Sequence, residues 1–251
     1  MYRQIIKLEG TINNVNLPDL DVTQAEIDAA QISGLTVWPA MYSWGASPDN
    51  AGLLDRLTDA IRMANGSTAV STRFAAGGTP SLEGYAPNAV NQAIVSALDT
   101  SESFTVGLVV RTGCAFGSYS SAANAWWIIN DNISNSATLG KLRLSIGGIS
   151  STFAEYAGPV LTATDWHRLV LIVDRAAGTI KVRHNGVDAL LKAGLSTSAV
   201  IRGELAVGVF NTGAQSIRAA QYRSPIAFNR ALSGDDLAIV EALLLEKTLV
   251  A

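Results

Sequence analysis

The segment DWHRLVLIVDRAAGTIKVRHNGV, residues 165–187, constrains the fold more than any other part of the chain. Its first half is apolar on both faces of an extended strand, with Leu169, Leu171 and Val173 on one face and Val170 and Ile172 on the other. Its second half, TIKVRHNG, alternates apolar and basic residues and ends in the Asn-Gly pair typical of a tight turn. The pattern predicts a β-hairpin whose first strand lies inside a sheet, away from its edge.

Further short strands are predicted along most of the chain. Apolar runs bounded by Gly, Asn, Asp, Ser and Pro give roughly ten of them. Their sequences are LTVWPAMYSW, STAVSTRFAA, SFTVGLVVRT, AWWIIND, KLRLSIGG, WHRLVLIVD, TIKVRHNG, ELAVGVFN and SIRAAQYRSPIAFN. So many short strands at close spacing indicate an all-β sandwich or barrel.

A helix is expected near each end of the chain. Thr23 with Glu26 three residues later forms a capping-box pattern, and Gly34 is placed to stop the short helix that follows. Near the C-terminus, SGDDLAIVEALLLEKTLV changes to a helical period behind a Ser233 cap. Its predicted buried face consists of Leu237, Val240, Leu244 and Leu245.

Composition excludes several kinds of protein. The 251 residues carry a formal charge of −3, and their Lys and Arg are dispersed, so no basic stripe for nucleic acid is present. Cys114 is the only cysteine, which excludes an intrachain disulfide. No run of about 18 apolar residues and no signal-peptide pattern is found. We expect a protein made in the cytoplasm without membrane insertion.

The order of these segments resembles the concanavalin A-like lectin and glucanase superfamily, in particular its laminin-G-like jelly rolls. The resemblance is carried by Trp166 through Gly186, by SFTVGLVVRTG (103–113), by RGELAVGVFN (202–211) and by SPIAFNRALSGDDLAIVEALL (224–244). It implies an all-β jelly-roll sandwich of two antiparallel sheets with a short N-terminal arm and a C-terminal helix. The expected division is an arm over residues 1–34 and the jelly roll over residues 35–251.

Within this superfamily the Gly- and Ala-rich, weakly charged sequence is similar to virion proteins of tailed bacteriophages. That likeness implies a non-enzymatic capsid-decoration or tail protein whose partners are other virion proteins. The arm would attach it, and its candidate contact residues are Tyr2, Ile5, Ile6, Leu8, Leu17 and Leu20. With 48% hydrophobic and 16% charged residues, the chain is expected to bury apolar surface in a homo-oligomer. A trimer is the favoured oligomer.

The chemistry of hydrolysis is not indicated. Glucanases of the superfamily carry a Glu-x-Asp-x-(x)-Glu pattern on one strand, which puts both catalytic carboxylates on the same face. The sequence has no such pattern, and its acidic residues in the strand region stand singly. His167 and His184 have no nucleophile motif beside them and are interpreted as structural residues at strand ends or turns.

The sequence offers better candidates for ligand binding than for catalysis. Tyr119, Trp126 and Trp127 lie among small polar residues, and adjacent tryptophans in a strand point to opposite faces, so one is available as a sugar platform or an interface anchor. Trp38, Trp44 and Trp166 are expected in the core or in packing at the end of a sheet. No cofactor is expected, although calcium could be held by two Asp- and Asn-rich loops, with candidate ligands Asp49, Asn50, Asp131, Asn132 and Asn135. Those residues are equally typical of turns.

Three functions therefore remain open at this point. The first is the virion structural protein, the second a glycan-binding adhesin for a host surface, and the third, least favoured, a glycoside hydrolase. Deleting the arm tests the first function, and substituting Trp126 or Trp127 tests the second.

Overall fold

The structure is a computed structural model of the whole chain. It describes residues 23–38, 102–111, 165–194 and 221–249 and, between them, the short strands at 52–54, 61–65, 73–74, 82–83, 94–97, 115–118, 127–131, 142–146, 154–155 and 204–207. Structural statements below refer to these residues.

Sixteen strands form two antiparallel sheets of eight strands each. The central sheet has the order β14 (Val187–Ala193), β13 (Thr179–His184), β12 (His167–Asp174), β7 (Phe104–Arg111), β16 (Gln221–Phe228), β5 (Leu82–Glu83), β4 (Arg73–Phe74), with β1 (Leu35–Val37) also paired to β16. The outer sheet has the order β11 (Ala154–Glu155), β10 (Leu142–Ile146), β9 (Trp127–Asp131), β8 (Ala115–Ser118), β15 (Glu204–Val207), β6 (Ile94–Ala97), β3 (Ile61–Asn65), β2 (Gly52–Leu54).

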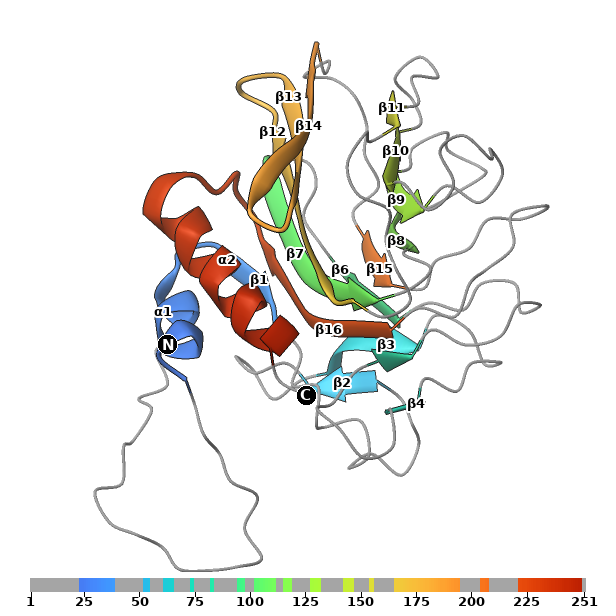
Figure 1. The fold of residues 1–251 in the computed structure, drawn as a ribbon, viewed down its shortest axis with the longest axis vertical. Coiled ribbons are helices and arrows are strands. Elements are labelled where there is room, and N and C mark those ends of the chain that lie inside the picture. The colour runs from blue at the N-terminus through green and yellow to red at the C-terminus, as the bar shows by residue number, and fades with distance from the viewer. Residues whose placement is uncertain are drawn as a thin grey trace, which may run out of the picture.

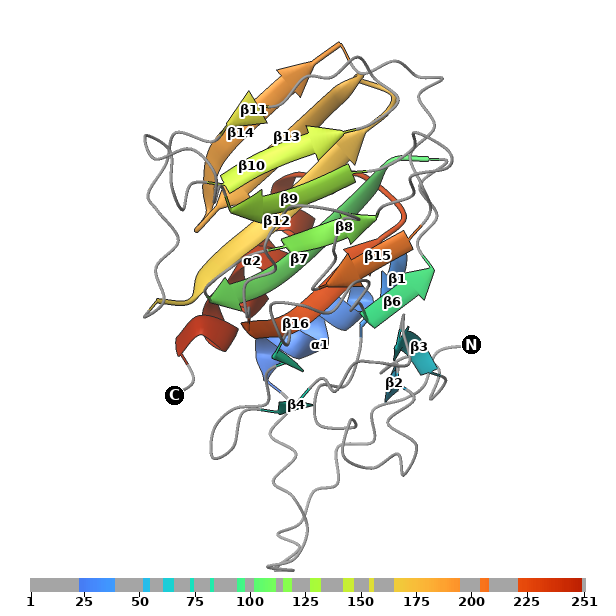
Figure 2. The same ribbon diagram turned by 90° about the vertical axis from the view of Figure 1, so that its right-hand side faces the viewer.

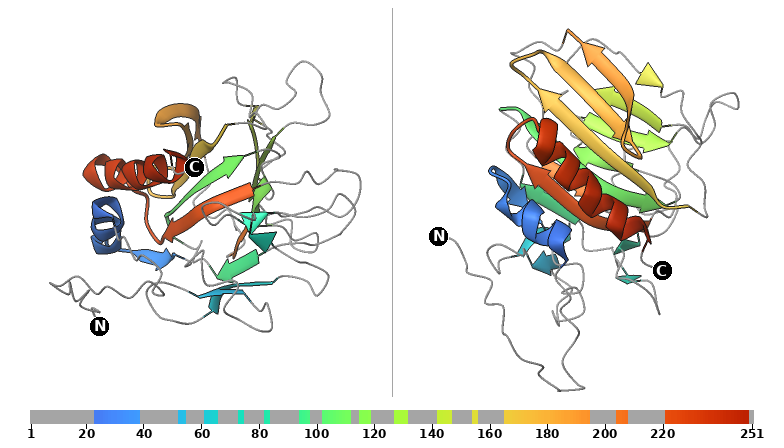
Figure 3. Two further views of the ribbon diagram at one scale, coloured as in Figure 1. Left: turned by 60° about the horizontal axis from the view of Figure 1, so that its bottom comes forward. Right: turned by 60° about the vertical axis from the view of Figure 1, so that its left-hand side comes forward.

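The elements stack in three layers. Helices α1 (Gln24–Gln31) and α2 (Gly234–Leu249) cover one face of the central sheet, and the outer sheet lies across its other face (Figures 1 and 3). Figure 2 looks onto the outer sheet, with the central sheet and the helices behind it. The molecule is the expected all-β jelly-roll sandwich of two antiparallel sheets with a C-terminal helix.

The hairpin predicted from residues 165–187 is confirmed. Strand β12 lies between β7 and β13, and the residues of both its faces, Leu169 through Val173, are buried. Asn185 and Gly186 adopt φ values of 51° and 84°, the pair of left-handed residues that a two-residue hairpin turn needs. The chain then continues into a third strand, β14, which the sequence analysis did not predict because VDALLKA lacks clean alternation.

The turn also brings Gly186 close to helix α2. A Cβ at this position would lie 2.9 Å from Glu241 Oε2, and its φ is one that side chains rarely adopt. We expect Gly186→Ala to lower the free energy of unfolding by about 2 kcal/mol, measured by urea denaturation. The matched control is Gly194→Ala, where φ is +79° but no atom lies within 4 Å, so the cost is that of backbone strain alone, about 1 kcal/mol. Equal losses in the two variants would show that the contact with α2 contributes nothing.

A continuous apolar core joins the helices to the central sheet. Gly107 of β7 leaves room for α2, because a Cβ there would lie 3.1 Å from Leu244 and 3.4 Å from Val240. Its buried members come from both helices, from the sheet face beneath them and from the segments next to these elements. They are Ala29, Ile32, Trp38, Val109, Val170, Ile172, Ile226, Phe228, Leu232, Val240, Leu243 and Leu244. The predicted core position of Trp38 is thereby confirmed, whereas Trp44 lies outside the described residues.

One position of the predicted C-terminal helix is corrected. Helix α2 follows Ser233 as expected, and Val240 and Leu244 are buried. Leu245 is 43% exposed, and Leu243 takes its place in the core. Since five residues turn the helix about 140° past Val240, Leu245 lies on the solvent side, while Leu243 stays beside the sheet.

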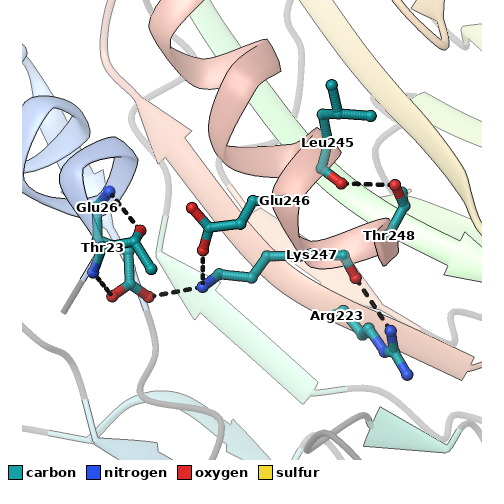
Figure 4. Close-up of polar contacts among 7 residues, drawn as sticks. All are labelled: Thr23, Glu26, Arg223, Leu245, Glu246, Lys247 and Thr248. Carbon is teal, nitrogen blue, oxygen red and sulfur yellow. Dashed lines mark hydrogen bonds and ion pairs between the residues drawn. The ribbon is translucent and has the colours of Figure 1, made fainter. Parts of the chain in front are cut away.

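The N-terminal helix forms as the capping box predicts. The Glu26 amide donates to Thr23 Oγ1 at 3.2 Å, and the Thr23 amide donates to the Glu26 carboxylate at 3.4 Å (Figure 4). The same carboxylate reaches α2, where Lys247 Nζ lies 3.0 Å from it. Helix α1 thus docks on α2, and residues 23–32 belong to the helical layer of the sandwich.

Candidate functional site

The order of the three layers (helices, central sheet and outer sheet) determines which sheet faces are covered by other described elements. The helix-side face of the central sheet is closed by the core that α1 and α2 form with it, and its other face is turned toward the outer sheet (Figure 3). Among the described elements, none packs on the outward face of the outer sheet (Figure 2). This outward face is the candidate binding surface.

The predicted aromatic cluster falls on a strand of that sheet. Trp127 is the first residue of β9, between β8 and β10, and it is paired with Ser118 and Ile146. Tyr119 and Trp126 lie outside the described residues. Trp127 is therefore placed in the outer sheet, and the site stays a prediction.

Of the candidate calcium ligands the structure describes only Asp131, and it describes none of the candidate arm residues. Asp131 is the last residue of β9 and pairs with Leu142, whereas Asp49, Asn50, Asn132 and Asn135 lie outside the described residues. Within the described part of the chain, no group of three or more His, Cys, Asp or Glu residues could hold a metal ion. Calcium binding stays a prediction. The arm residues Tyr2, Ile5, Ile6, Leu8, Leu17 and Leu20 also lie outside the described residues.

The two histidines form a buried pair. His167 begins β12 and His184 ends β13, as expected of strand-end residues, but both are buried, and His167 Nδ1 lies 3.0 Å from His184 Nε2. Their interpretation as sheet-edge or turn residues missed this contact. The signal was available, because His184 has the same parity as the inward Ile180 and Val182.

The surroundings keep this pair neutral. Burial lowers the pKa of His184 to about 4, and the neighbouring His167 and Arg168 act in the same direction. Burial also lowers the pKa of His167, and the carboxylate of Asp165 opposes that change in part. A hydrogen bond between two neutral imidazoles needs one ring to donate and the other to accept. The pair thus joins two neighbouring strands of the central sheet.

A tryptophan and two arginines lie at the C-terminal end of α2. The guanidinium carbon of Arg223 lies 3.8 Å from the centroid of the Trp166 ring, and that of Arg111 lies 4.9 Å from it. Arg223 Nη1 also donates to the carbonyl of Lys247 in the last turn of α2 (Figure 4). Burial and the nearby Arg111 lower the pKa of Arg223. The cluster joins the helix end to the sheet, and Trp166, partly buried against the core directly before β12, has the sheet-end packing role predicted for it.

Neither helix in the described part of the chain is both long and apolar enough to cross a membrane.

Comparison with known proteins gives a fold and no family. No protein-family model matches the chain, and no curated protein matches its sequence. Solved structures do match. One is of botulinum neurotoxin type C, described as depending on two ganglioside molecules for cell entry, with 12% identity and a TM-score of 0.60 over 88% of this chain and 53% of that one.

Two further matches are binding domains of related toxins. The serotype D domain aligns with 14% identity and a TM-score of 0.58, over 86% of this chain and 52% of that one. The D/C domain, solved in complex with rat synaptotagmin II, aligns with 12% identity and a TM-score of 0.58, over 85% and 51%. The chain thus spans about half the length of these structures. At such low identity the likeness establishes only the architecture that they share, a jelly-roll sandwich.

Proposed function

We propose that the chain is a non-enzymatic recognition module that binds a glycan on the outward face of its outer sheet. The observation that carries the proposal is the layering: the helices close one side of the sandwich, and no described element packs on the outward face of the outer sheet. The matched structures add support, because they are binding domains, and one is described with gangliosides and another with N-acetylneuraminic acid.

We propose that Trp127, with its sequence neighbours, holds the sugar. Trp127 is paired with Ser118; Trp126 precedes Trp127 and Tyr119 follows Ser118 in the sequence. A sugar ring presents C–H groups that stack on an aromatic ring and hydroxyls that need polar neighbours. Ser118, Ser120 and Ser121 supply such neighbours in the sequence.

A glycan array with the whole chain tests this function. We expect a signal that falls about two- to tenfold in Trp126→Ala or Trp127→Ala, since stacking on one aromatic ring contributes about 0.5–1.5 kcal/mol. Trp166→Phe serves as the matched control, because that tryptophan packs between two arginines at the helix end, so its substitution should leave glycan binding unchanged. An array without signal from the folded protein, or equal binding by all three variants, contradicts the proposal.

The finer form of the proposal places this module on a tailed-bacteriophage virion, attached through the segment before α1. It is supported by the sequence resemblance and by apolar side chains left on the surface of α2, Leu245 at 43% and Leu249 at 74% exposure. Because Ala29 and Ile32 are core residues, the deletion that tests attachment should end at residue 22. We expect that shortened chain to fold and to be lost from particles, and unchanged incorporation would overturn the virion role.

A further inference from the structure

The solvent face of helix α2 carries a continuous apolar stripe. After Asp235, the exposed residues of this helix are spaced alternately four and three apart, which keeps them within about 60° of one another around the helix axis. They are Ala238, Ala242, Leu245 and Leu249, with Leu245 43% and Leu249 74% exposed. The buried residues Val240, Leu243 and Leu244 lie on the opposite side of the helix. Helix α2 is therefore apolar on two sides, and the sandwich buries one of them.

The spacing of the stripe fits a second α-helix. Apolar residues at alternating distances of three and four are the contact positions of paired helices, whereas the solvent face of a surface helix is usually polar. Helix α1 follows the usual pattern, because its exposed residues are Gln24 and Gln31. Of the two described helices, only α2 carries exposed apolar residues on its solvent side.

A second copy of α2 that runs in the opposite direction complements the stripe. With a two-fold axis between positions 243 and 244, Ala242 lies opposite Leu245 of the second copy, and Ala238 lies opposite Leu249 of the second copy. A small side chain then faces a large one at each of the four contacts, which lets two helices pack closely without voids. The chain thus supplies both halves of the contact.

The charges beside the stripe favour this antiparallel direction. Glu241 flanks the stripe on one side and Glu246 on the other. Parallel helices would bring these two positions of different copies together, whereas antiparallel helices put Thr248 of the second copy near Glu241 and Ile239 near Glu246. Each carboxylate also has a cation of its own chain nearby, so the preference is modest. The antiparallel arrangement also places opposite ends of the helix dipoles side by side.

We propose that two copies of the chain associate through this stripe, as an antiparallel pair of α2 helices about a two-fold axis. Such a contact is closed, so it gives a dimer in place of the trimer expected from composition. Helix α2 has 16 residues and is about 24 Å long, so the contact is smaller than a standard interface and the association is weak. The helices lie on the side of the sandwich opposite the outer sheet (Figure 3), so the inference does not depend on the proposed glycan site.

Sedimentation equilibrium of the whole chain tests the dimer. Between about 10 µM and about 1 mM, the weight-average mass should rise from that of one chain toward that of two. Leu245→Glu and Ala242→Glu should each raise the dissociation constant at least about tenfold, because they put a charge into an apolar contact. The matched control is Ala176→Glu, at an exposed position between β12 and β13, which should leave the constant unchanged. These substitutions replace exposed residues, so each single chain should fold like the wild type.

A mixture of two variants tests the direction of the pairing. Neither Leu245→Glu nor Ala242→Lys should dimerise well alone. In an antiparallel heterodimer of the two, the new glutamate lies opposite the new lysine, and the second pair of positions keeps Ala242 opposite Leu245. The equimolar mixture should therefore associate at least about fivefold more tightly than either variant alone. Parallel helices would not bring these charges together, and a mixture no tighter than its components would contradict the antiparallel pair.

Three further results would overturn the inference. A wild-type chain that stays monomeric at about 1 mM would leave the stripe to a different protein, such as another virion component. Equal dimerisation by Ala242→Glu and Ala176→Glu would place the contact elsewhere on the molecule. A chain that begins at residue 23 should dimerise like the whole chain. A lost or a much tighter dimer in that shortened chain would mean that the segment before α1 forms the contact or covers the stripe itself.

Discussion

Replacing Gly107 by leucine is expected to lower the free energy of unfolding by about 3 kcal/mol, because the new side chain occupies space that helix α2 fills. A single Cβ on Gly107 would already lie 3.1 Å from Leu244 Cδ1 and 3.3 Å from Ile226 Cγ2. The three further carbons of leucine extend into the same contact, so α2 must move outward and core packing is lost. Thermal or urea denaturation followed by tryptophan fluorescence measures the effect.

The control adds the same bulk on the opposite side of the helix. Ala242 is exposed on α2, and Ala242→Leu should change the stability by less than about 0.5 kcal/mol. The intermediate variant Gly107→Ala should fall between the two, since its neighbours have to shift by only a few tenths of an ångström. A Gly107→Leu protein as stable as Ala242→Leu would mean that α2 does not rest on β7.

Local sequence signals predict the elements whose conformation depends on their own residues. The turn at Asn185 and Gly186 and the capping box of Thr23 and Glu26 are each determined by a few neighbouring residues. The burial of Leu169 through Val173 follows from a strand that is apolar on both faces. These features therefore could be predicted before any tertiary contact was known.

Features that arise from pairing between distant segments could not be predicted in the same way. His167 meets His184 only because β12 and β13 pair in a register that puts His184 opposite Leu169. Strand β14 exists because β13 offers it an edge, although its own sequence does not alternate. The importance of Gly107 likewise appears only when α2, more than a hundred residues later, is packed on it.

The candidate site likewise combines a feature visible in the local sequence with one that depends on the pairing of distant segments. The aromatic pair at Trp126 and Trp127 is visible in the sequence, whereas the place of Trp127 in a strand of the outer sheet, which lies away from the helices, is known only from the fold (Figure 3). An exposed tryptophan is informative only when the face that it occupies is open. The fold therefore gives Trp127 a place in the outer sheet, and its part in binding stays a prediction for mutagenesis.

Removing the Glu26 side chain is the second substitution with a large expected effect. Its carboxylate is almost fully buried, caps α1 and lies 3.0 Å from Lys247 Nζ of α2 (Figure 4). We expect Glu26→Ala to lower the free energy of unfolding by about 3 kcal/mol, because it removes the cap and leaves a buried ammonium with one partner fewer. Glu246, 2.8 Å from the same nitrogen, limits the loss.

A double-mutant cycle separates the ion pair from the cap. Glu26→Gln keeps hydrogen-bonding groups for the cap but removes the charge, and combined with Lys247→Met it should give a coupling energy of about 1–2 kcal/mol. The control on the same helix is Asp28→Ala, which removes an exposed hydrogen bond with Gln24 and should cost less than about 0.5 kcal/mol. A coupling energy near zero would mean that α1 is held to α2 by its apolar residues alone, and the segment before α1 would then be attached to the sandwich only through Ala29 and Ile32.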